Sequence, residues 1–328
     1  MSFTVNDELA DTAMLVETDT RGGSRRTARR SARVIAATVA ALALPAGSAV
    51  AATTAPPAVT APTPVSAHAA AATMSPMWRG DFDAGNLSQY FQVLNTNAGA
   101  EPGKRIFLDA SRKLGGAYSA RFELRPGDVH KDGTNRIQLR GINYGNHYFN
   151  EGEDRYFRWA IYVDPSTTIG ASFSNPWRAI VAWPSVQDGA FSPMKYFLQR
   201  SAGNGASPSG TDSITMGGDL GHSGANDVTQ WSIPVQKGQW YEFITHWKFS
   251  ANPSTGLVEH WLKAPGSPSF VKQTFRNGSQ TLRMKTLSGA GATSNLRMGL
   301  YRNKAFSTID RVNYDNVYMG TSLASVGG

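Results

Sequence analysis

From Trp78 to the end of the chain, hydrophobic and polar residues alternate in short segments. In 121–125 and in 136–140, for example, the second and fourth residues are hydrophobic and the other three are polar. This period of two is typical of a β-strand with one buried face, and no window of a dozen residues has the period of a helix. The pattern predicts strands at 120–125, 135–141, 154–163, 178–183, 194–200, 213–217, 240–250, 256–263, 296–302 and 313–319.

Turn residues separate the expected strands. Glycine follows a polar residue at Asp132-Gly133, Asp188-Gly189, Lys237-Gly238 and Asn277-Gly278, and such pairs favour tight turns. The polar, Gly/Ser-rich stretch 203–224 is expected to be a long surface loop that frames a ligand groove. Many short strands joined by turns predict an all-β domain, a two-sheet sandwich of the jelly-roll kind.

The first part of the chain is expected to carry targeting information. Five arginines between Arg25 and Arg33 precede a short apolar run at 34–44, and Ala49-Val50-Ala51 resembles a signal-peptidase site. Because the apolar run is too short for a mature membrane anchor, we expect a secreted, extracellular protein. General secretion and the twin-arginine route both stay open. The expected organisation is a secretory signal region at 1–51, an Ala/Thr/Pro-rich linker at 52–76 and one folded domain at 77–328.

Composition narrows the chemistry. The chain has no Cys, which excludes disulfides, thiolate metal ligands and a Cys nucleophile. The formal net charge is +8, and the expected domain alone keeps 26 basic and 19 acidic residues, a net charge of +7. The positive charge therefore belongs to the folded domain and predicts an anionic partner. The expected secretion and the lack of a recognisable nucleic-acid-binding motif argue against nucleic acid as the anionic partner.

Much of this charge falls on one side of the expected strands, because residues of like parity share a face. If these faces coincide, they form a cationic groove that also carries amide and aromatic groups. The alternative is that the polar residues of each strand form only the solvated side of a half-buried strand. The polar residues of these strands include Arg121, Arg125, Arg136, Gln138, Arg140, Lys195, Arg297 and Tyr301.

Several motifs occur in the order found in one family. The motifs are Asp81-Phe82-Asp83-Ala84-Gly85-Asn86-Leu87, Arg121-x-Glu123-Leu124-Arg125, Trp240…His246-Trp247-Lys248-Phe249-Ser250, Gly256-x-Val258-Glu259-x-Trp261-Leu262, Met298-Gly299-Leu300-Tyr301-Arg302 and Tyr314-Asp315-Asn316-Val317. In this order they resemble the secreted bacterial polysaccharide lyases of the heparin lyase I-like and glucuronan lyase-like group, over roughly residues 80–320.

The resemblance implies a concanavalin A-like jelly roll whose concave face holds an anionic polysaccharide and cleaves it by β-elimination. In that reaction the uronate carboxylate is neutralised, a base removes the C5 proton, and an acid protonates the departing glycosidic oxygen. Tyr301 matches the family's catalytic Tyr, and its ordinary pKa of ~10 must be lowered by nearby cations before it works as a base. Arg297 stands where relatives keep a cation beside that Tyr. Arg121 and Arg125 match the family's substrate-binding Arg strand.

The chain departs from its relatives at one motif. Many relatives carry Gln-x-His on a central strand, with Gln neutralising the carboxylate and His serving as base, whereas this chain has Ala182-Trp183-Pro184. The neutralising group and the base are then expected elsewhere. His147 is the candidate catalytic histidine, and His130, Gln187 and Lys195 are possible substitutes.

The remaining candidates are binding residues. Gln138, Arg140 and Lys195 are expected to contact the substrate. Trp183 is a candidate platform for stacking a sugar ring, with packing in the core as the alternative. His246, in a strand rich in Trp and Phe, is expected to be structural.

Other chemistries have weaker support. No His-x-His or Glu-x-x-His cluster indicates a metal or other cofactor, and no loop of closely spaced acids specifies a structural calcium ion. Acids such as Asp219, Asp227 and Glu242 form no compact pair for glycoside hydrolysis. The leading hypothesis is a monomeric secreted lyase acting on an anionic, uronate-containing polysaccharide. The alternatives are a non-catalytic carbohydrate-binding jelly roll and a glycoside hydrolase of sandwich fold.

Overall fold

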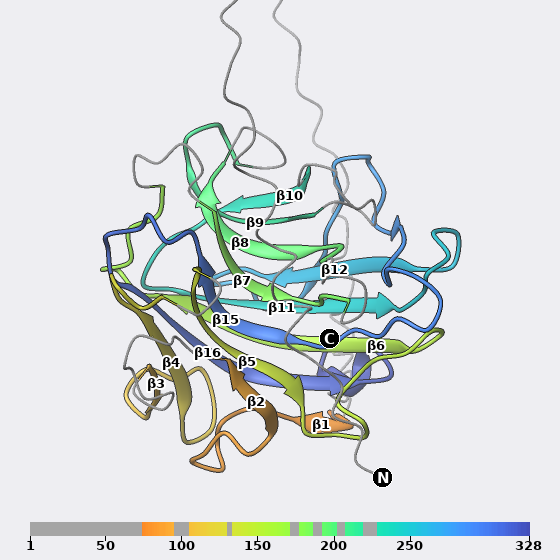
Figure 1. Ribbon diagram of the computed structural model, residues 1–328, viewed down its shortest axis with the longest axis horizontal. Helices are drawn as coiled ribbons and strands as arrows, with labels where there is room; N and C mark the ends of the chain where they lie inside the picture. Colours follow the sequence, from red (N-terminus) through yellow and green to blue (C-terminus); the bar gives the residue numbers. More distant parts are fainter. Residues whose placement is uncertain are drawn as a thin grey trace, which may run out of the picture. The chain divides into compact units, whose positions relative to one another are not determined.

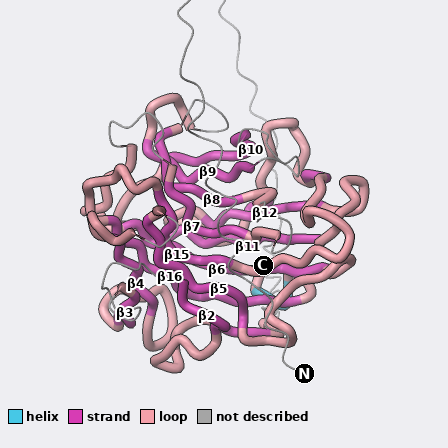
Figure 2. The backbone as a smooth tube through the Cα atoms, in the orientation of Figure 1, coloured by secondary structure: helices cyan, strands magenta, loops and turns pink. Residues whose placement is uncertain are grey.

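The computed structural model describes residues 74–94, 105–129, 133–170, 177–185, 192–201, 207–218 and 228–328. The expected signal region and nearly all of the linker therefore lie outside the described residues. The described part is built of strands and loops, and its one helical element is a short 3-10 turn at Ala324–Val326 (Figures 1 and 2). None of the described residues forms a helix long and apolar enough to cross a membrane.

One sheet of the domain has nine strands, all paired antiparallel. Two short strands extend it at the side, β1 (Trp78–Arg79) on β16 and β14 (Leu282–Arg283) on β12. The order of the others is β13 (Val271–Lys272), β12 (Leu257–Lys263), β11 (Trp240–Lys248), β6 (Asp154–Val163), β16 (Asp310–Gly320), β4 (Ser119–Leu124) and β3 (Ile106–Asp109).

The second sheet has seven strands and is also antiparallel. Strands distant in sequence are neighbours here, because the chain crosses between the sheets as in a jelly roll. The all-β sandwich predicted from the sequence is thereby confirmed (Figure 1). The order is β10 (Val228–Pro234), β9 (Asp212–Gly218), β8 (Lys195–Arg200), β7 (Arg178–Ala182), β15 (Arg297–Arg302), β5 (Asn135–Ile142) and β2 (Tyr90–Leu94).

All ten predicted strands are present, with ends displaced by no more than three residues. Six strands were not predicted: the short strands β1, β2, β3, β13 and β14, and also β10. In β10 the register with β9 shifts between Thr229 and Trp231, and Pro234 ends the strand. A bulge of this kind interrupts the period of two, so hydrophobic and polar residues no longer alternate along the strand.

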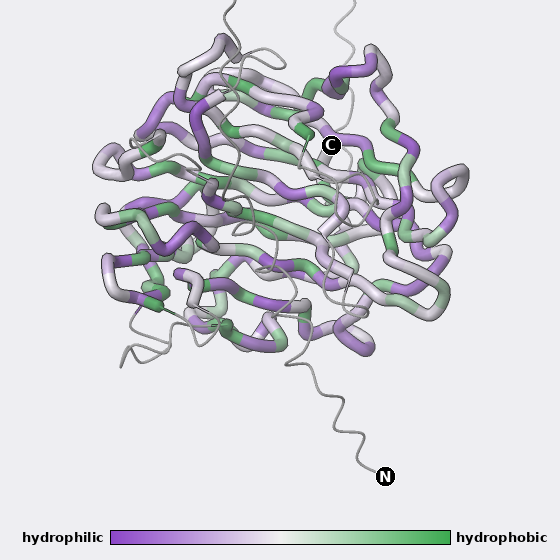
Figure 3. Tube along the Cα trace, turned by 45° about the horizontal axis from the view of Figure 1, so that its top comes forward, coloured by the Kyte–Doolittle hydropathy of each residue, from purple (hydrophilic) through white to green (hydrophobic). Residues whose placement is uncertain are grey.

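The core lies between the sheets and is rich in aromatic rings. Trp159 of β6 stacks on Phe243 of β11 at 4.4 Å, and both contact Tyr196 of β8 in the opposite sheet. Hydrophobic and hydrophilic residues alternate along the strands (Figure 3). Each fully buried large side chain contributes roughly 1.5–3 kcal/mol, so this layer is the main force that holds the sheets together.

A buried ion cluster joins the sheets at one place. The Asp310 carboxylate of β16 accepts hydrogen bonds from Arg178 of β7 at 2.5 Å and from Arg302 of β15 at 2.7 Å. All three side chains are completely buried. Because an unpaired charge in such a place would cost several kcal/mol, the cluster holds β7 and β15 against β16 in one register.

The core also holds a neutral histidine. His260 of β12 is fully buried, packs against Trp231 and Phe275, and has Nδ1 3.3 Å from the Tyr196 hydroxyl. Burial penalises the imidazolium and lowers the pKa of His260 from 6.5 to about 3.

This histidine predicts a specific loss of stability in acid. As the pH falls from 6.5 towards 3, the unfolded chain binds a proton at His260 that the folded chain does not bind, so stability is lost. Relative to His260→Phe, the free energy of unfolding of the parent should fall by up to about 1.4 kcal/mol per pH unit in this range. Urea unfolding at several pH values measures the difference, and parallel pH profiles would contradict it.

Candidate active site

The outer side of the seven-stranded sheet carries a row of cations around Tyr301. Met298 and Leu300 of β15 face the core, so Arg297, Gly299 and Tyr301 face outwards. Antiparallel pairing places these three opposite β5 residues of the same face, since Arg297 pairs with Arg140, Gly299 with Gln138 and Tyr301 with Arg136. We call this surface the cationic face and define it by Arg136, Gln138, Arg140, Lys195, Arg297 and Tyr301.

Lys195 joins the row from the far side of β7. Ala182 of β7 pairs with Arg297 on one side and with Lys195 of β8 on the other. The small alanine residue separates the two cations. Within the described residues, the outward positions of β5, β15, β7 and β8 include no Asp or Glu. The face therefore suits an anionic ligand.

Tyr301 is held in a small cluster of its own. Its ring packs with Ala179, Phe197 and Trp177, apart from the main core, and lies 4.8 Å from the Trp177 ring. The Arg136 guanidinium lies 4.7 Å from the centre of the Tyr301 ring. A cation over an aromatic face is attracted by the ring's quadrupole, so Arg136 and Trp177 together orient the phenol.

Between Arg297 and Tyr301 the sheet has a bare position. Gly299 has φ of +140°, and a Cβ there would lie 2.2 Å from the carbonyl oxygen of Ile137. Only glycine fits, because the same Cβ would also lie 2.8 Å from Gln138 Cα and 3.0 Å from the Phe122 ring of the core.

The backbone at this position is supported from the other sheet. The pairing of β15 with β7 shifts register between Met298 and Tyr301. The hydroxyl of Tyr314 in β16 lies 2.9 Å from the Gly299 carbonyl oxygen and 2.8 Å from that of Ile180. Burial raises the pKa of Tyr314 well above its usual value, so the hydroxyl stays protonated and its one proton is shared by the two carbonyls.

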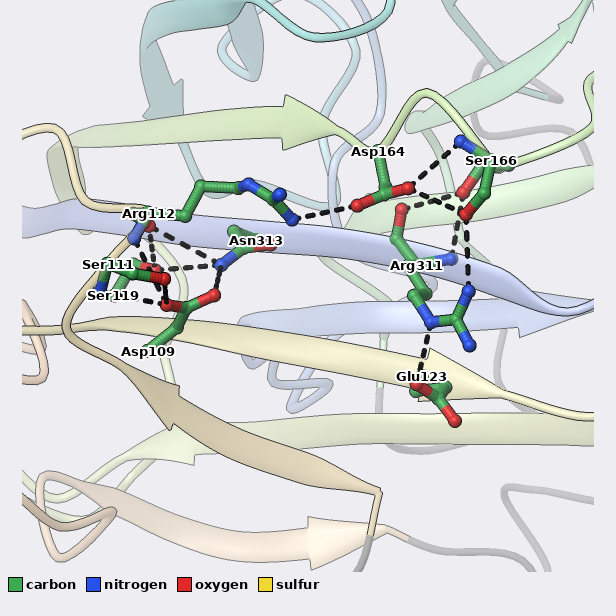
Figure 4. A network of polar contacts seen from close by, with 10 residues as sticks. Asp109, Ser111, Arg112, Ser119, Glu123, Asp164, Ser166, Arg311 and Asn313 are labelled. Atoms are coloured by element: carbon green, nitrogen blue, oxygen red, sulfur yellow. Dashed lines mark hydrogen bonds and ion pairs between the residues drawn. The ribbon is translucent and has the colours of Figure 1, made fainter.

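Arg121 and Arg125 do not belong to this face. They lie in or beside β4 of the nine-stranded sheet, so the prediction that this strand shares a face with Tyr301 is wrong. Arg125 Nε donates to Glu123 at 2.5 Å, and Arg311 donates to the same carboxylate at 2.8 Å (Figure 4). Burial raises the pKa of Glu123, but these hydrogen bonds lower it by more. The strand belongs to a surface ion network.

The same network extends along β16. Arg112 forms an ion pair with Asp164 at 2.8 Å, and Asn313 donates to Asp109 at 3.2 Å (Figure 4). Arg121 lies with its guanidinium 4.6 Å from the Phe107 ring centre. These contacts connect β3, β4, β6 and β16, which gives the arginines of β4 a structural role.

The sequence contains a second copy of the arginine motif, and this copy is the one beside Tyr301. Arg121-Phe122-Glu123-Leu124-Arg125 and Arg136-Ile137-Gln138-Leu139-Arg140 have the same spacing. Only β5, which carries the second copy, pairs with β15. The repetition was visible in the sequence, but strand alternation does not tell which copy lies in which sheet.

Trp183 is a core residue rather than a platform for sugars. Its side chain is fully buried and packs on Trp247 at 4.8 Å and on Phe157 at 5.4 Å. The role as a sugar-stacking residue is therefore wrong, and the core alternative holds. Exposed aromatic rings are found instead at Phe91 and Tyr144, each 44% exposed.

His147 lies at the far end of the face from Tyr301. Its Nδ1 is 2.9 Å from the Ile142 carbonyl oxygen, and its ring stacks on Phe91 at 4.2 Å. Because a carbonyl only accepts hydrogen bonds, Nδ1 carries the proton, and in the neutral ring Nε2 carries the lone pair. Ile142 lies six residues along β5 from Arg136, about 20 Å, so His147 is not within hydrogen-bond reach of Tyr301.

The other candidates lie elsewhere. His246 sits in the nine-stranded sheet between Asp154 and Glu259, at 2.5 and 2.9 Å. Glu242, in the same sheet, is bound by Arg158 and Lys263. Four further candidates, His130, Gln187, Asp219 and Asp227, lie outside the described residues.

The described part of the chain holds no group of three or more His, Asp or Glu side chains arranged to bind a metal ion. A cavity of about 370 Å³ lies between Gln230, Trp231 and the 271–276 segment, at the β10 and β13 edges of the sheets. It is remote from Tyr301 in the strand order, so the cavity and the cationic face are separate features.

A two-sheet sandwich with Arg, Lys, Gln and Tyr in one row has the chemistry of a protein that binds an acidic polysaccharide. The family model for polysaccharide lyases matches residues 82–318, and the chain therefore belongs to this family. It is an enzyme, a lyase that cleaves uronate-containing polysaccharide by β-elimination. Among curated protein sequences, none matches the chain significantly.

Solved structures share the fold at low sequence identity. An endo-β-1,4-glucuronan lyase from the fungus Trichoderma reesei is 14% identical, with a TM-score of 0.51 over 74% of this chain and 94% of that one. The catalytic domain of a glycoside hydrolase family 131 protein from Coprinopsis cinerea is 13% identical, with a TM-score of 0.52 over 76% and 95%. Since a lyase and a hydrolase are about equally similar, the fold alone does not decide the chemistry.

The Tyr314 hydroxyl gives the first prediction for the site. Tyr314→Phe should lower the free energy of unfolding by about 1–3 kcal/mol, because two buried carbonyls lose their shared donor. It should also lower kcat, because Gly299 and Tyr301 lose their support. Tyr318→Phe is the matched control, since its hydroxyl bonds only to Asn316 nearby in the same strand. A Tyr314→Phe protein as stable and active as the control would contradict this support.

Proposed function

We propose that the cationic face binds the uronate chain and that elimination takes place over Gly299, with Tyr301 transferring the proton. The observation that carries this proposal is the pairing of β15 with β5, which places Arg297, Gly299 and Tyr301 opposite Arg140, Gln138 and Arg136. A carboxylate, a proton donor or acceptor and a glycosidic oxygen must meet at one point of the substrate. This part of the face places an amide, guanidinium groups and a phenol side by side on two neighbouring strands.

The carboxylate is neutralised by β5 and β15 together. Gln138 is nearly buried and stands between Arg136 and Arg140 on its own strand, with Arg297 diagonal to it. An amide N–H and a guanidinium donate hydrogen bonds to the carboxylate and withdraw charge from it, which makes the C5 proton acidic enough to leave. Gln138 thus performs from β5 the task of the family's missing Gln on β7.

Tyr301 acts at the C5 proton and at the leaving oxygen. The Arg136 guanidinium lies beside the Tyr301 ring, so a positive charge stands next to the reacting phenol. As phenolate, Tyr301 takes the C5 proton; the C5 electrons form the C4–C5 double bond, and the C4–oxygen bond breaks. As phenol, Tyr301 returns that proton to the departing oxygen when both lie on the same side of the sugar. The enzyme then ends in its starting protonation state.

We also propose that the enzyme is exported and works as a monomer on polysaccharide outside the cell. The basic segment before the apolar run at 34–44 and the small residues at Ala49-Val50-Ala51 support export. The proposed site is built from strands of one chain, which supports action as a monomer.

One assay tests the reaction and the residue together. The protein from residue 74 onwards is incubated with glucuronan, alginate, hyaluronan and heparin, and the ultraviolet absorbance of an unsaturated uronate product is followed. Tyr301→Phe should lower kcat at least ~100-fold on the cleaved polymer and leave binding nearly unchanged, because only the hydroxyl is lost.

The control for this assay is Tyr162→Phe, a tyrosine of the nine-stranded sheet that stacks near Trp240. New reducing ends without the unsaturated product would indicate hydrolysis and overturn the proposal. Binding without any cleavage would indicate a carbohydrate-binding protein. Full activity of Tyr301→Phe would remove Tyr301 from the reaction.

A further inference from the structure

Asn295, two residues before β15, has an unsatisfied side chain. It is 1% exposed, and neither its Nδ2 nor its Oδ1 has a hydrogen-bond partner. Leaving a buried amide without a partner is costly, since the group has lost its water and gained no hydrogen bond in exchange. The side chain can accept one hydrogen bond or more and donate two.

The register of the sheet determines which way Asn295 points. Arg297 pairs with Ala182 and Ser294 bridges to Ser185, so the same register continues and Asn295 stands opposite Pro184. Leu296 is buried in the main core. Because neighbours alternate along an extended chain, Asn295 faces the same side as Arg297, which is the cationic face.

A partner for Asn295 can approach only from that face. On one flank, Pro184 has no polar side chain to offer. On the other flank the backbone is occupied, since Gly141 N donates to Leu296 O at 2.8 Å and Phe149 pairs with Ser294. The core lies behind. The amide is therefore directed towards the cationic face.

The surroundings of Asn295 suit an acidic sugar. Arg297 is the next residue on the same face, and Arg140 opposite it receives support from Gln92 at 3.2 Å. His147, whose Nδ1 bonds to Ile142, lies at this same end of the sheet, with Phe91 stacked on its ring. Amide, guanidinium, imidazole and an aromatic ring together match a carboxylate and the hydroxyls and apolar face of a sugar.

Distance separates this end from the reaction. Asn295 lies six residues from Tyr301 along one extended strand, or about 20 Å. A single sugar unit cannot contact both residues. The uronate held at Asn295 must be a different unit of the same chain from the one that is cleaved.

We propose that Asn295 is the centre of a second uronate-binding subsite, several sugar units away from the cleavage point. Its Nδ2 donates to the carboxylate of that unit and its Oδ1 accepts from a hydroxyl. The proposal rests on the proposed reaction at Tyr301. It makes the enzyme dependent on long chains and directs cleavage to internal bonds.

Binding to oligosaccharides of increasing length tests the subsite without any cleavage. Glucuronan and alginate oligosaccharides are titrated calorimetrically into the Tyr301→Phe protein and into the same protein with Asn295→Leu or Asn295→Asp. Affinity should rise in a step once the oligosaccharide spans both ends of the face. Asn295→Leu should lose about tenfold or more in affinity for the long oligosaccharides only, the effect of one hydrogen bond to a charged group.

Asn295→Asp keeps the shape and adds a negative charge. It should weaken the binding of long oligosaccharides further than Asn295→Leu, and salt should reduce the difference by screening the repulsion. If Asn295→Leu does not fold, which thermal unfolding reveals, the isosteric Asp variant decides the question.

Asn135→Leu is the matched control. Asn135 is also 1% exposed with both amide atoms unpartnered, but it alternates with the core-facing Ile137 and so points away from the cationic face. This variant should alter stability and leave the dependence on length unchanged.

The outcomes separate the two proposals. No step with either polymer, or an equal loss for short and long oligosaccharides in the Asn295 variants, overturns the second subsite and leaves Tyr301 untouched. Full elimination by the Tyr301→Phe protein overturns the reaction centre, whereas the length dependence of binding still reports on Asn295.

Discussion

The hydroxyl of Tyr314 is the contact on which the site depends. The two sheets are held together by a non-directional aromatic core, which fixes their spacing but not the position of a single peptide. At the shift in register between β7 and β15, the carbonyls of Ile180 and Gly299 meet one buried hydroxyl from β16. That contact sets the backbone at the bare glycine, and through it the positions of Arg297 and Tyr301. The ion cluster around Asp310 then holds β7 and β15 in the register that this contact requires.

Alternation along the chain was sufficient for the fold and insufficient for the site. It predicted ten of the sixteen strands, the sandwich and the outward side of β5 and β15, because burial of one face imposes a period of two. It could not tell which strands are neighbours, since pairing joins residues far apart in sequence. Arg121 and Arg136 begin motifs of equal spacing, yet only Arg136 stands beside Tyr301. The sequence alone also does not tell whether Trp183 faces the core or the solvent. Its pairing opposite the core residue Leu296 places it in the core.

Ala182 and Pro184 show how the chemistry can be redistributed within a sheet. Both face the cationic side of β7, and neither can donate a hydrogen bond to a carboxylate from its side chain. Amide side chains are found instead on the neighbouring segments: Gln138 of β5 lies opposite Gly299, and Asn295, just before β15, lies opposite Pro184. No pattern in the sequence marks Asn295, because it precedes the regular strand and its unsatisfied amide is visible only when its neighbours are in position.

We propose that uronate binds on the outer side of the seven-stranded sheet, over Gly299. A crystal structure of the Tyr301→Phe protein with a long uronate oligosaccharide would show where the sugar chain lies. The sugar chain should lie along β15, between β5 and β7, with one carboxylate hydrogen-bonded to Gln138 and Arg297. A chain bound instead on the nine-stranded sheet beside Arg121 and Arg125, or at the cavity beside Trp231, would contradict the proposal.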